Sequence, residues 1–198
     1  MIIRLAFCFC MALLLTSCKG KKKKAQHTSE AFFPVRSFLQ SQVKHVDTSL
    51  YRIEKVEWDG SRYDTSIVQR EAFHALAQDF LDLPDINAKD LRDDYEESNT
   101  YDQLMQRAVL TYYTTEQDRE VRKEDVLIKP GTTDSSQVET IVIDKVRTAG
   151  DSTVEKNMVW EVGKRFTVIT KTQKGNAPEK IRKLIVLWND FNTTDEQQ

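Results

Sequence analysis

The chain has 198 residues, of which 39% are hydrophobic and 30% charged, with 29 Lys and Arg against 31 Asp and Glu and a formal net charge of −2. This near balance argues against a nucleic-acid-binding domain, which presents a strongly basic surface. Length and composition instead predict one domain with an ordinary core and a heavily charged surface.

The N-terminal segment has the pattern of an export signal. Arg4 is followed by an apolar run from Leu5 to Leu15, and small residues precede Cys18. An uncleaved anchor is the weaker alternative, because an ordinary membrane span needs ~20 apolar residues. Leu15-Thr16-Ser17-Cys18 is the pattern of a bacterial lipobox. We predict that residues 1–17 are a lipoprotein signal peptide and that Cys18 becomes the acylated, palmitate-bearing N-terminus.

Residues 18–31 are predicted to be a tether. Lys19 and Lys21–Lys24 supply five lysines without an apolar residue, a composition that stays solvated. Beside a bilayer, each lysine adds about 1 kcal/mol of attraction to anionic headgroups. A nucleic-acid patch is the alternative, but interleaved aromatic residues are lacking. We therefore expect the membrane as partner, through the lipid on Cys18 and the lysines, and no nucleic acid.

Two segments have the apolar periodicity of helices. Between Phe32 and Val46, apolar residues recur at steps of three and four, which predicts a helix with Pro34 in its first turn. A similar stripe predicts a second helix over Gln69–Leu83. The preceding Ser66-x-x-Gln69 sequence resembles a capping box.

Strands are predicted on either side of turn signals. Leu50–Trp58 and Arg62–Ile67 flank Asp59-Gly60, a strong hairpin signal. The acidic stretch Asp85–Thr100 has no glycine to force a calcium-loop turn, so we expect a short solvated helix there. Gly163-Lys164 is expected to be a two-residue hairpin turn. Further strands are predicted at 108–113, 120–129, 138–147, 154–162, 166–171 and 181–188.

Successive strands with short polar turns indicate an antiparallel sheet. We predict an α+β fold, an antiparallel β-meander with two main helices packed on one face. The domain is expected to span 32–192, with a disordered polar tail at 193–198. Phe38, Phe80 and Trp160 are predicted to lie in the core, where truncation of a large aromatic side chain to alanine typically costs about 3–5 kcal/mol.

No motif for catalysis or cofactor binding occurs. The sequence lacks a Gly-x-Ser-x-Gly elbow, a His-Glu-x-x-His pair, a phosphate loop and a dinucleotide fingerprint. His27, His45 and His74 are isolated from one another, and Cys8 and Cys10 leave with the signal peptide, so no metal site is expected. We predict that the protein is not an enzyme, with no catalytic residue, cofactor or metal.

Two non-enzymatic functions remain open. The first is a protein-binding or structural module of the cell envelope, docking through a sheet edge. For that edge we expect Glu120–Lys129, whose charges guard it against aggregation, with Arg122 and Glu124 as cross-linking positions. The alternative is a carrier of a lipid or other apolar ligand between sheet and helices. Five aromatic residues would either line such a cavity or simply fill the core: Trp58, Tyr112, Tyr113, Trp160 and Trp188.

Two stretches carry a resemblance to a known family. Phe32-Phe33-Pro34-Val35-x-x-Phe38-Leu39-x-x-Gln42 and Leu187-Trp188-Asn189-Asp190-Phe191 resemble the beginning and end of a family of uncharacterised lipoproteins from Bacteroidota. The resemblance implies an envelope lipoprotein of a Gram-negative cell and assigns no site residue. Surface-exported members of that phylum tend to have acidic residues after the lipidated cysteine. Lys19-Gly20-Lys21 at these positions favours the periplasmic face of the outer membrane.

Overall fold

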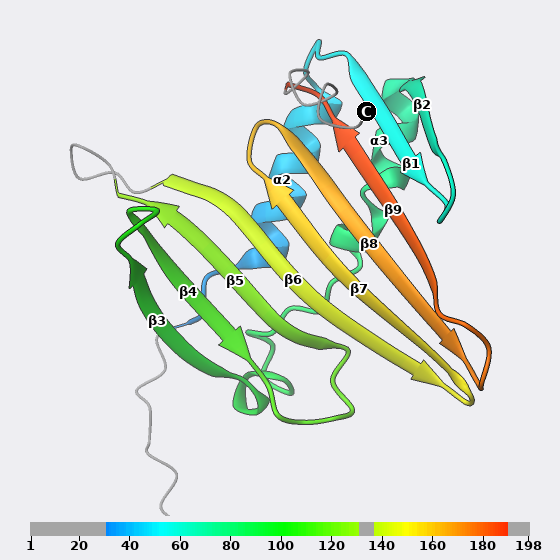
Figure 1. Cartoon of the computed structure of the whole chain (residues 1–198). Coiled ribbons are helices and arrows are strands. Elements are labelled where there is room, and N and C mark those ends of the chain that lie inside the picture. The colour runs from blue at the N-terminus through cyan, green and yellow to red at the C-terminus, as the bar shows by residue number, and fades with distance from the viewer. Residues whose placement is uncertain (1–30, 131–136, 190–198) are drawn as a thin grey trace, which may run out of the picture. The chain divides into compact units, whose positions relative to one another are not determined.

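In the part of the chain that the structure describes, nine strands form one antiparallel sheet, in the order β2-β1-β9-β8-β7-β6-β5-β4-β3. The computed structural model describes residues 31–130 and 137–189. The strands are β1 (Ile53–Trp58), β2 (Tyr63–Val68), β3 (Glu96–Asp102), β4 (Arg107–Tyr113), β5 (Val121–Lys129), β6 (Gln137–Ala149), β7 (Ser152–Glu161), β8 (Arg165–Lys174) and β9 (Lys180–Leu187). Figure 1 shows the helices behind this sheet and its front face uncovered. The predicted α+β meander with helices on one face is confirmed.

Helix α2 (Val35–Asp47) follows from its apolar stripe. Val35, Leu39, Val43 and Val46 are all buried, because steps of three and four residues keep side chains on one helix face. Pro34 stands just before the helix, at its N-cap, one position earlier than predicted. None of the helices within residues 31–130 and 137–189 is long and apolar enough to span a membrane.

The second predicted helix is broken into α3 (Arg70–Leu76) and α4 (Gln78–Leu81). At Ala77 the regular α-helical hydrogen bonding is interrupted, and the Phe80 N–H donates to the Ala77 carbonyl, three residues before it. Phe73, Ala77 and Phe80 are nevertheless all fully buried. The capping box is wrong, because Ser66 lies within β2 and Gln69 caps α3 without a side-chain hydrogen bond.

The acidic stretch differs from the predicted helix. Only Arg92–Asp94 forms a short 3-10 helix (η1), and Glu96–Asp102 forms strand β3. The reason is tertiary, since every residue of β3 pairs with β4. The β7–β8 turn is also longer than predicted: Glu161 pairs with Arg165, which leaves three residues between them.

The core lies between the helices and the covered face of the sheet. Residues directly opposite one another on neighbouring strands share a face. One such row on the covered face consists of Leu110, Val126, Ile141, Trp160, Phe166 and Val186. Phe73 of α3 and Phe80 of α4 pack on this row, with ring centroids 6.1 Å from Phe166 and 5.2 Å from Trp160 respectively.

Candidate functional site

The predicted lipidation site lies outside the described residues. Cys18, the lysine tether, His27 and the tail at 193–198 are all beyond residues 31–130 and 137–189. The signal peptide, the acylation of Cys18 and the tether therefore remain predictions from the sequence.

The predicted docking edge is wrong. Strand β5 is an interior strand, paired with β4 on one side and β6 on the other, so Glu120–Lys129 offers no free edge. Glu124 is only 1% exposed, and the Arg122 guanidinium donates to the carbonyls of Glu116 and Gln117. The charges on β5 indicated an exposed strand, but strand order depends on long-range pairing that charge does not encode.

The two edges of the sheet are β2 and β3. Strand β3 (Glu-Glu-Ser-Asn-Thr-Tyr-Asp) carries three carboxylates, whereas β2 (Tyr-Asp-Thr-Ser-Ile-Val) carries only Asp64. Charged side chains protect an edge from pairing with another strand. Strand β2 is therefore the less protected edge, and we regard its outer side as the candidate docking edge.

The backbone of β2 presents donors on its outer side. At the start of the β1–β2 ladder, the Asp59 N–H donates to the Arg62 carbonyl. Hydrogen-bonded pairs alternate along an antiparallel ladder, so the next bonded pairs along the register are Glu57 with Asp64 and Lys55 with Ser66. The amides of the intervening residues point away from β1. These residues are Tyr63, Thr65 and Ile67.

The same three residues carry side chains onto the uncovered face. Thr65 ends a row across that face, which begins at Ser98 and runs through Thr111, Asp125, Val142, Val159, Thr167, Ile185 and Val56. Tyr63 is 49% and Ile67 65% exposed. Beside them, Val56, Ile185 and Leu187 form a small apolar cluster. An added strand would thus meet an apolar surface as well as free amides.

The β1–β2 hairpin is held by Asp59. Its carboxylate accepts hydrogen bonds from the Ser61 N–H (2.9 Å), the Ser61 hydroxyl (2.8 Å) and the Arg62 N–H (3.1 Å). These bonds, led by the Ser61 hydroxyl, lower the pKa of Asp59 to about 2. Gly60 has a φ of +106°, which only glycine adopts readily. The turn predicted at Asp59-Gly60 thus fixes the position of β2.

The tryptophans of the core pack against other rings. Trp160 lies 5.4 Å from Phe166 and 5.2 Å from Trp188, centroid to centroid. Trp160, Trp188 and Tyr112 are 1% exposed or less. Three surface hollows have volumes of about 400, 440 and 270 Å³, and none of these three is lined by Trp160 or Trp188. Trp58, another of the five predicted aromatic residues, does line the 400 Å³ hollow, and the carrier alternative stays a prediction.

A buried carboxyl at Glu124 was missed by the sequence reasoning. Glu124 lies opposite Tyr112 on β4 and Ile143 on β6, and its Oε2 atom has no hydrogen-bond partner. Burial, followed by the charge of Asp85, raises its pKa to about 8. The sequence did contain a signal for this burial. Glu124 lies two residues before the apolar Val126, and side chains two residues apart on a strand point to the same face of the sheet.

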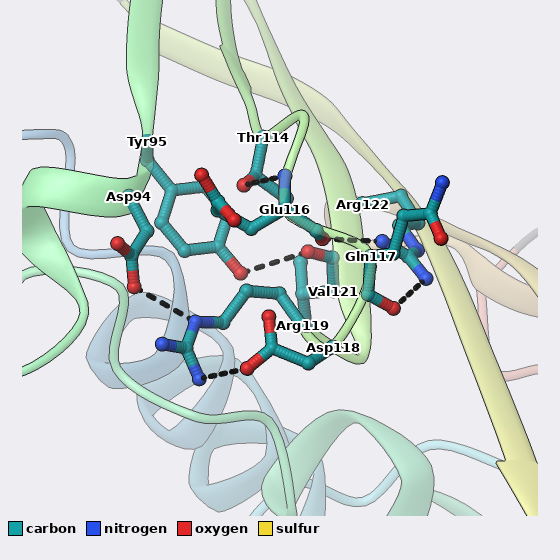
Figure 2. Close-up of polar contacts among 9 residues, drawn as sticks. All are labelled: Asp94, Tyr95, Thr114, Glu116, Gln117, Asp118, Arg119, Val121 and Arg122. Atoms are coloured by element: carbon teal, nitrogen blue, oxygen red, sulfur yellow. Dashed lines mark hydrogen bonds and ion pairs between the residues drawn. The ribbon is translucent and has the colours of Figure 1, made fainter.

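Polar contacts tie the β4–β5 loop to the segment before β3. Figure 2 shows the Arg119 guanidinium donating to Asp94 (2.8 Å) and contacting Asp118 (3.3 Å). The Tyr95 hydroxyl donates to the buried Val121 carbonyl at 2.7 Å. Burial is the main cause that raises the pKa of Tyr95 to about 12, so this hydroxyl keeps its proton at neutral pH.

The two histidines in the described part of the chain, His45 and His74, contact different residues. His74 Nδ1 is 3.4 Å from an Asp47 carboxylate oxygen, and the His45 ring lies 6.2 Å from Tyr51. Within residues 31–130 and 137–189, no group of three or more His, Cys, Asp and Glu side chains is placed to hold a metal ion.

No protein-family model matches the chain, and comparisons with curated proteins and with solved structures returned no match.

Proposed function

We propose that the protein is a membrane-anchored cell-envelope lipoprotein that acts as a non-enzymatic binding module and docks an extended segment of another envelope protein along β2. The anchor rests on the sequence alone, on the lipobox ending at Cys18 and the lysines that follow it. The binding role rests on β2 as the less protected edge of the sheet.

The observation that carries the proposal is the combination of free amides and exposed apolar side chains on one edge strand. Main-chain hydrogen bonds to an edge supply affinity for an extended segment, and alternate side chains supply specificity. Ile67 at 65% exposure and Tyr63 at 49% sit beside the cluster of Val56, Ile185 and Leu187. A lipid anchor further raises the local concentration of the module for neighbours at the same membrane.

The anchor is tested by Cys18→Ser in cells fed a fatty-acid analogue. We expect the variant to lose the label and to accumulate as uncleaved precursor, whereas the wild-type chain is labelled. Label retained by Cys18→Ser would refute the lipid anchor without bearing on the β2 edge.

The docking edge is tested by in-cell cross-linking from two matched tyrosines. A photo-reactive phenylalanine analogue replaces either Tyr63 on β2 or Tyr101 on β3, which are 49% and 56% exposed. We expect one defined envelope-protein adduct from position 63 and none of that size from position 101. The same adduct from both positions, or only lipid adducts from position 63, would overturn the assignment to β2.

A further inference from the structure

The Glu124 side chain is buried in a position that disfavours an ionised carboxylate. It lies on the covered face of β5, between Tyr112 and Ile143, and is 1% exposed, with Oε2 lacking a hydrogen-bond partner. A buried ionised carboxyl without a partner is strongly unfavourable, so such a group stays neutral or the structure around it opens.

Two residues of the segment 82–95, which joins α4 to β3, lie close enough to this carboxyl to interact with its charge: Asp85 and Tyr95. Leu83, Ile86 and Tyr95 of this segment are 1%, 2% and 5% exposed. Its only regular structure is the three-residue η1. Its own backbone hydrogen bonds are short-range turns, such as Ala88 N–H to the Asp85 carbonyl and Arg92 N–H to the Ala88 carbonyl. A segment held by turns, without a continuous ladder, opens more readily than a long helix or a central strand.

The segment is attached to its surroundings by a few polar contacts. Asn87 and Phe32 exchange two hydrogen bonds, Phe32 N–H to Asn87 Oδ1 at 2.8 Å and Asn87 Nδ2 to the Phe32 carbonyl at 3.2 Å. At the other end, Tyr95 donates to Val121 and Asp94 accepts from Arg119, as Figure 2 shows.

The groups that act on Glu124 do not favour its ionised form. Asp85 of the segment is an acid and disfavours a second negative charge. Tyr95 and Tyr112 both have a raised pKa, with burial as the largest cause. Three cations of the surrounding elements contact other groups: Arg119 contacts Asp94, Arg122 contacts backbone carbonyls, and the Arg92 guanidinium lies over the Phe32 ring.

We propose that Glu124 is a proton-operated latch: its neutral carboxyl lets the segment 82–95 lie on the sheet, and loss of the proton releases that segment. Release would uncover Leu83, Ile86 and Tyr95, which are buried in the closed state, and thus expose apolar surface next to β3. This role is independent of docking along β2.

The direction of the pH effect follows from the two states of the carboxyl. In the closed state the pKa of Glu124 is about 8, and its ordinary value is 4.5. Between these values the closed state holds a proton that the open state releases, so opening becomes more favourable as the pH rises. Below about pH 4.5 both states are protonated, and above about pH 8 both are ionised, so the effect levels off at either end.

Hydrogen exchange of the full-length chain in detergent tests the latch. Protection of the amides in 82–95, corrected for the chemical exchange rate, is compared at pH 6 and pH 8.5 with that of amides in β7 and β8. We expect protection in 82–95 to fall at least tenfold with no such fall in β7 and β8. Unchanged protection in 82–95 would overturn the proposal.

Four variants separate the effect of the carboxyl from general effects. Glu124→Gln and Glu124→Leu should each abolish the pH-dependent fall, while the exposed control Glu155→Gln should keep it. Asp85→Asn should bring the levelling-off to a lower pH, because it removes one cause of the raised pKa of Glu124. The latch would be refuted if protection of the amides in 82–95 still fell with pH in a folded Glu124 variant. It would also be refuted if Asp85→Asn left unchanged the pH at which this fall levels off.

Discussion

The two halves of the covered face are filled in different ways. Over β7, β8 and the end of β9, the rings of Phe73 and Phe80 meet Trp160, Phe166 and Trp188 at centroid distances of 5.2–6.1 Å. Over β4 and β5, the filling is Tyr95, Tyr112 and Glu124, whose polar atoms need partners. The same strand pattern thus carries an aromatic half beneath α3 and α4, in which the Nε1 atoms of Trp160 and Trp188 lack hydrogen-bond partners, and a polar half next to a segment with little regular structure.

One sheet can therefore combine a half whose packing is insensitive to pH with a half whose packing depends on the protonation of one carboxyl. Aromatic packing depends little on pH, because none of the rings ionises. The half around Glu124 depends on a proton and on single hydrogen bonds, since a lost partner leaves a buried polar group unsatisfied. The edges differ as well, with a charge-poor β2 next to the aromatic half and an acidic β3 next to the polar half.

The largest effect is expected from Trp160→Ala in the aromatic half. Trp160 is fully buried, and removing such a side chain lowers the free energy of unfolding by about 3–5 kcal/mol. Chemical denaturation of Trp160→Ala against Trp58→Ala, a partly exposed tryptophan, measures the difference. If both variants lose the same stability, the aromatic half is not the main source of stability.

Phe38→Ala should fall below Trp160→Ala in the same measurement. The sequence predicts Phe38 as a core residue equal to Phe80 and Trp160, but it is only partly buried and packs at the edge of the core. Its ring lies 5.5 Å from Phe33, so truncation removes fewer contacts. A loss as large as that of Trp160→Ala would contradict this placement.

A smaller effect is expected from Tyr95→Phe in the polar half. The change removes the hydroxyl that donates to the buried Val121 carbonyl, and an unsatisfied buried acceptor costs about 1–3 kcal/mol. Tyr101→Phe, at an exposed tyrosine of β3, is the matched control and should leave the unfolding free energy unchanged. Equal stability of Tyr95→Phe and the control would mean that this hydrogen bond does not hold the segment.

Local patterns predicted the elements better than their arrangement. The stripe from Val35 to Val46 gave α2, and Asp59-Gly60 gave the first hairpin, because each signal depends on neighbours in the sequence. Strand β3 was missed because all but the last of its residues are exposed and no alternation marks it. It is a strand only because β4 pairs with it.

The candidate site was predicted less well than the fold. Docking at a sheet edge was expected, but the edge itself was misassigned to β5, because edge position depends on which strands pair across the whole sheet. Glu124 was taken as an exposed position, although its phase with Val126 pointed inward. The charge of Glu124 suggested an exposed side chain, whereas its alternation with Val126 along the strand correctly indicated the covered face.

The most direct test of docking along β2 uses Thr65, whose amide points away from β1. Thr65→Pro removes this donor without removing a β1–β2 hydrogen bond, and edge positions tolerate proline. Thr65→Val keeps the amide and removes only the hydroxyl. The measured quantity is the yield of the adduct from a photo-reactive residue at position 63. We predict at least a tenfold loss of adduct in Thr65→Pro and an unchanged yield in Thr65→Val, whereas equal yields from both variants would contradict docking through the backbone of β2.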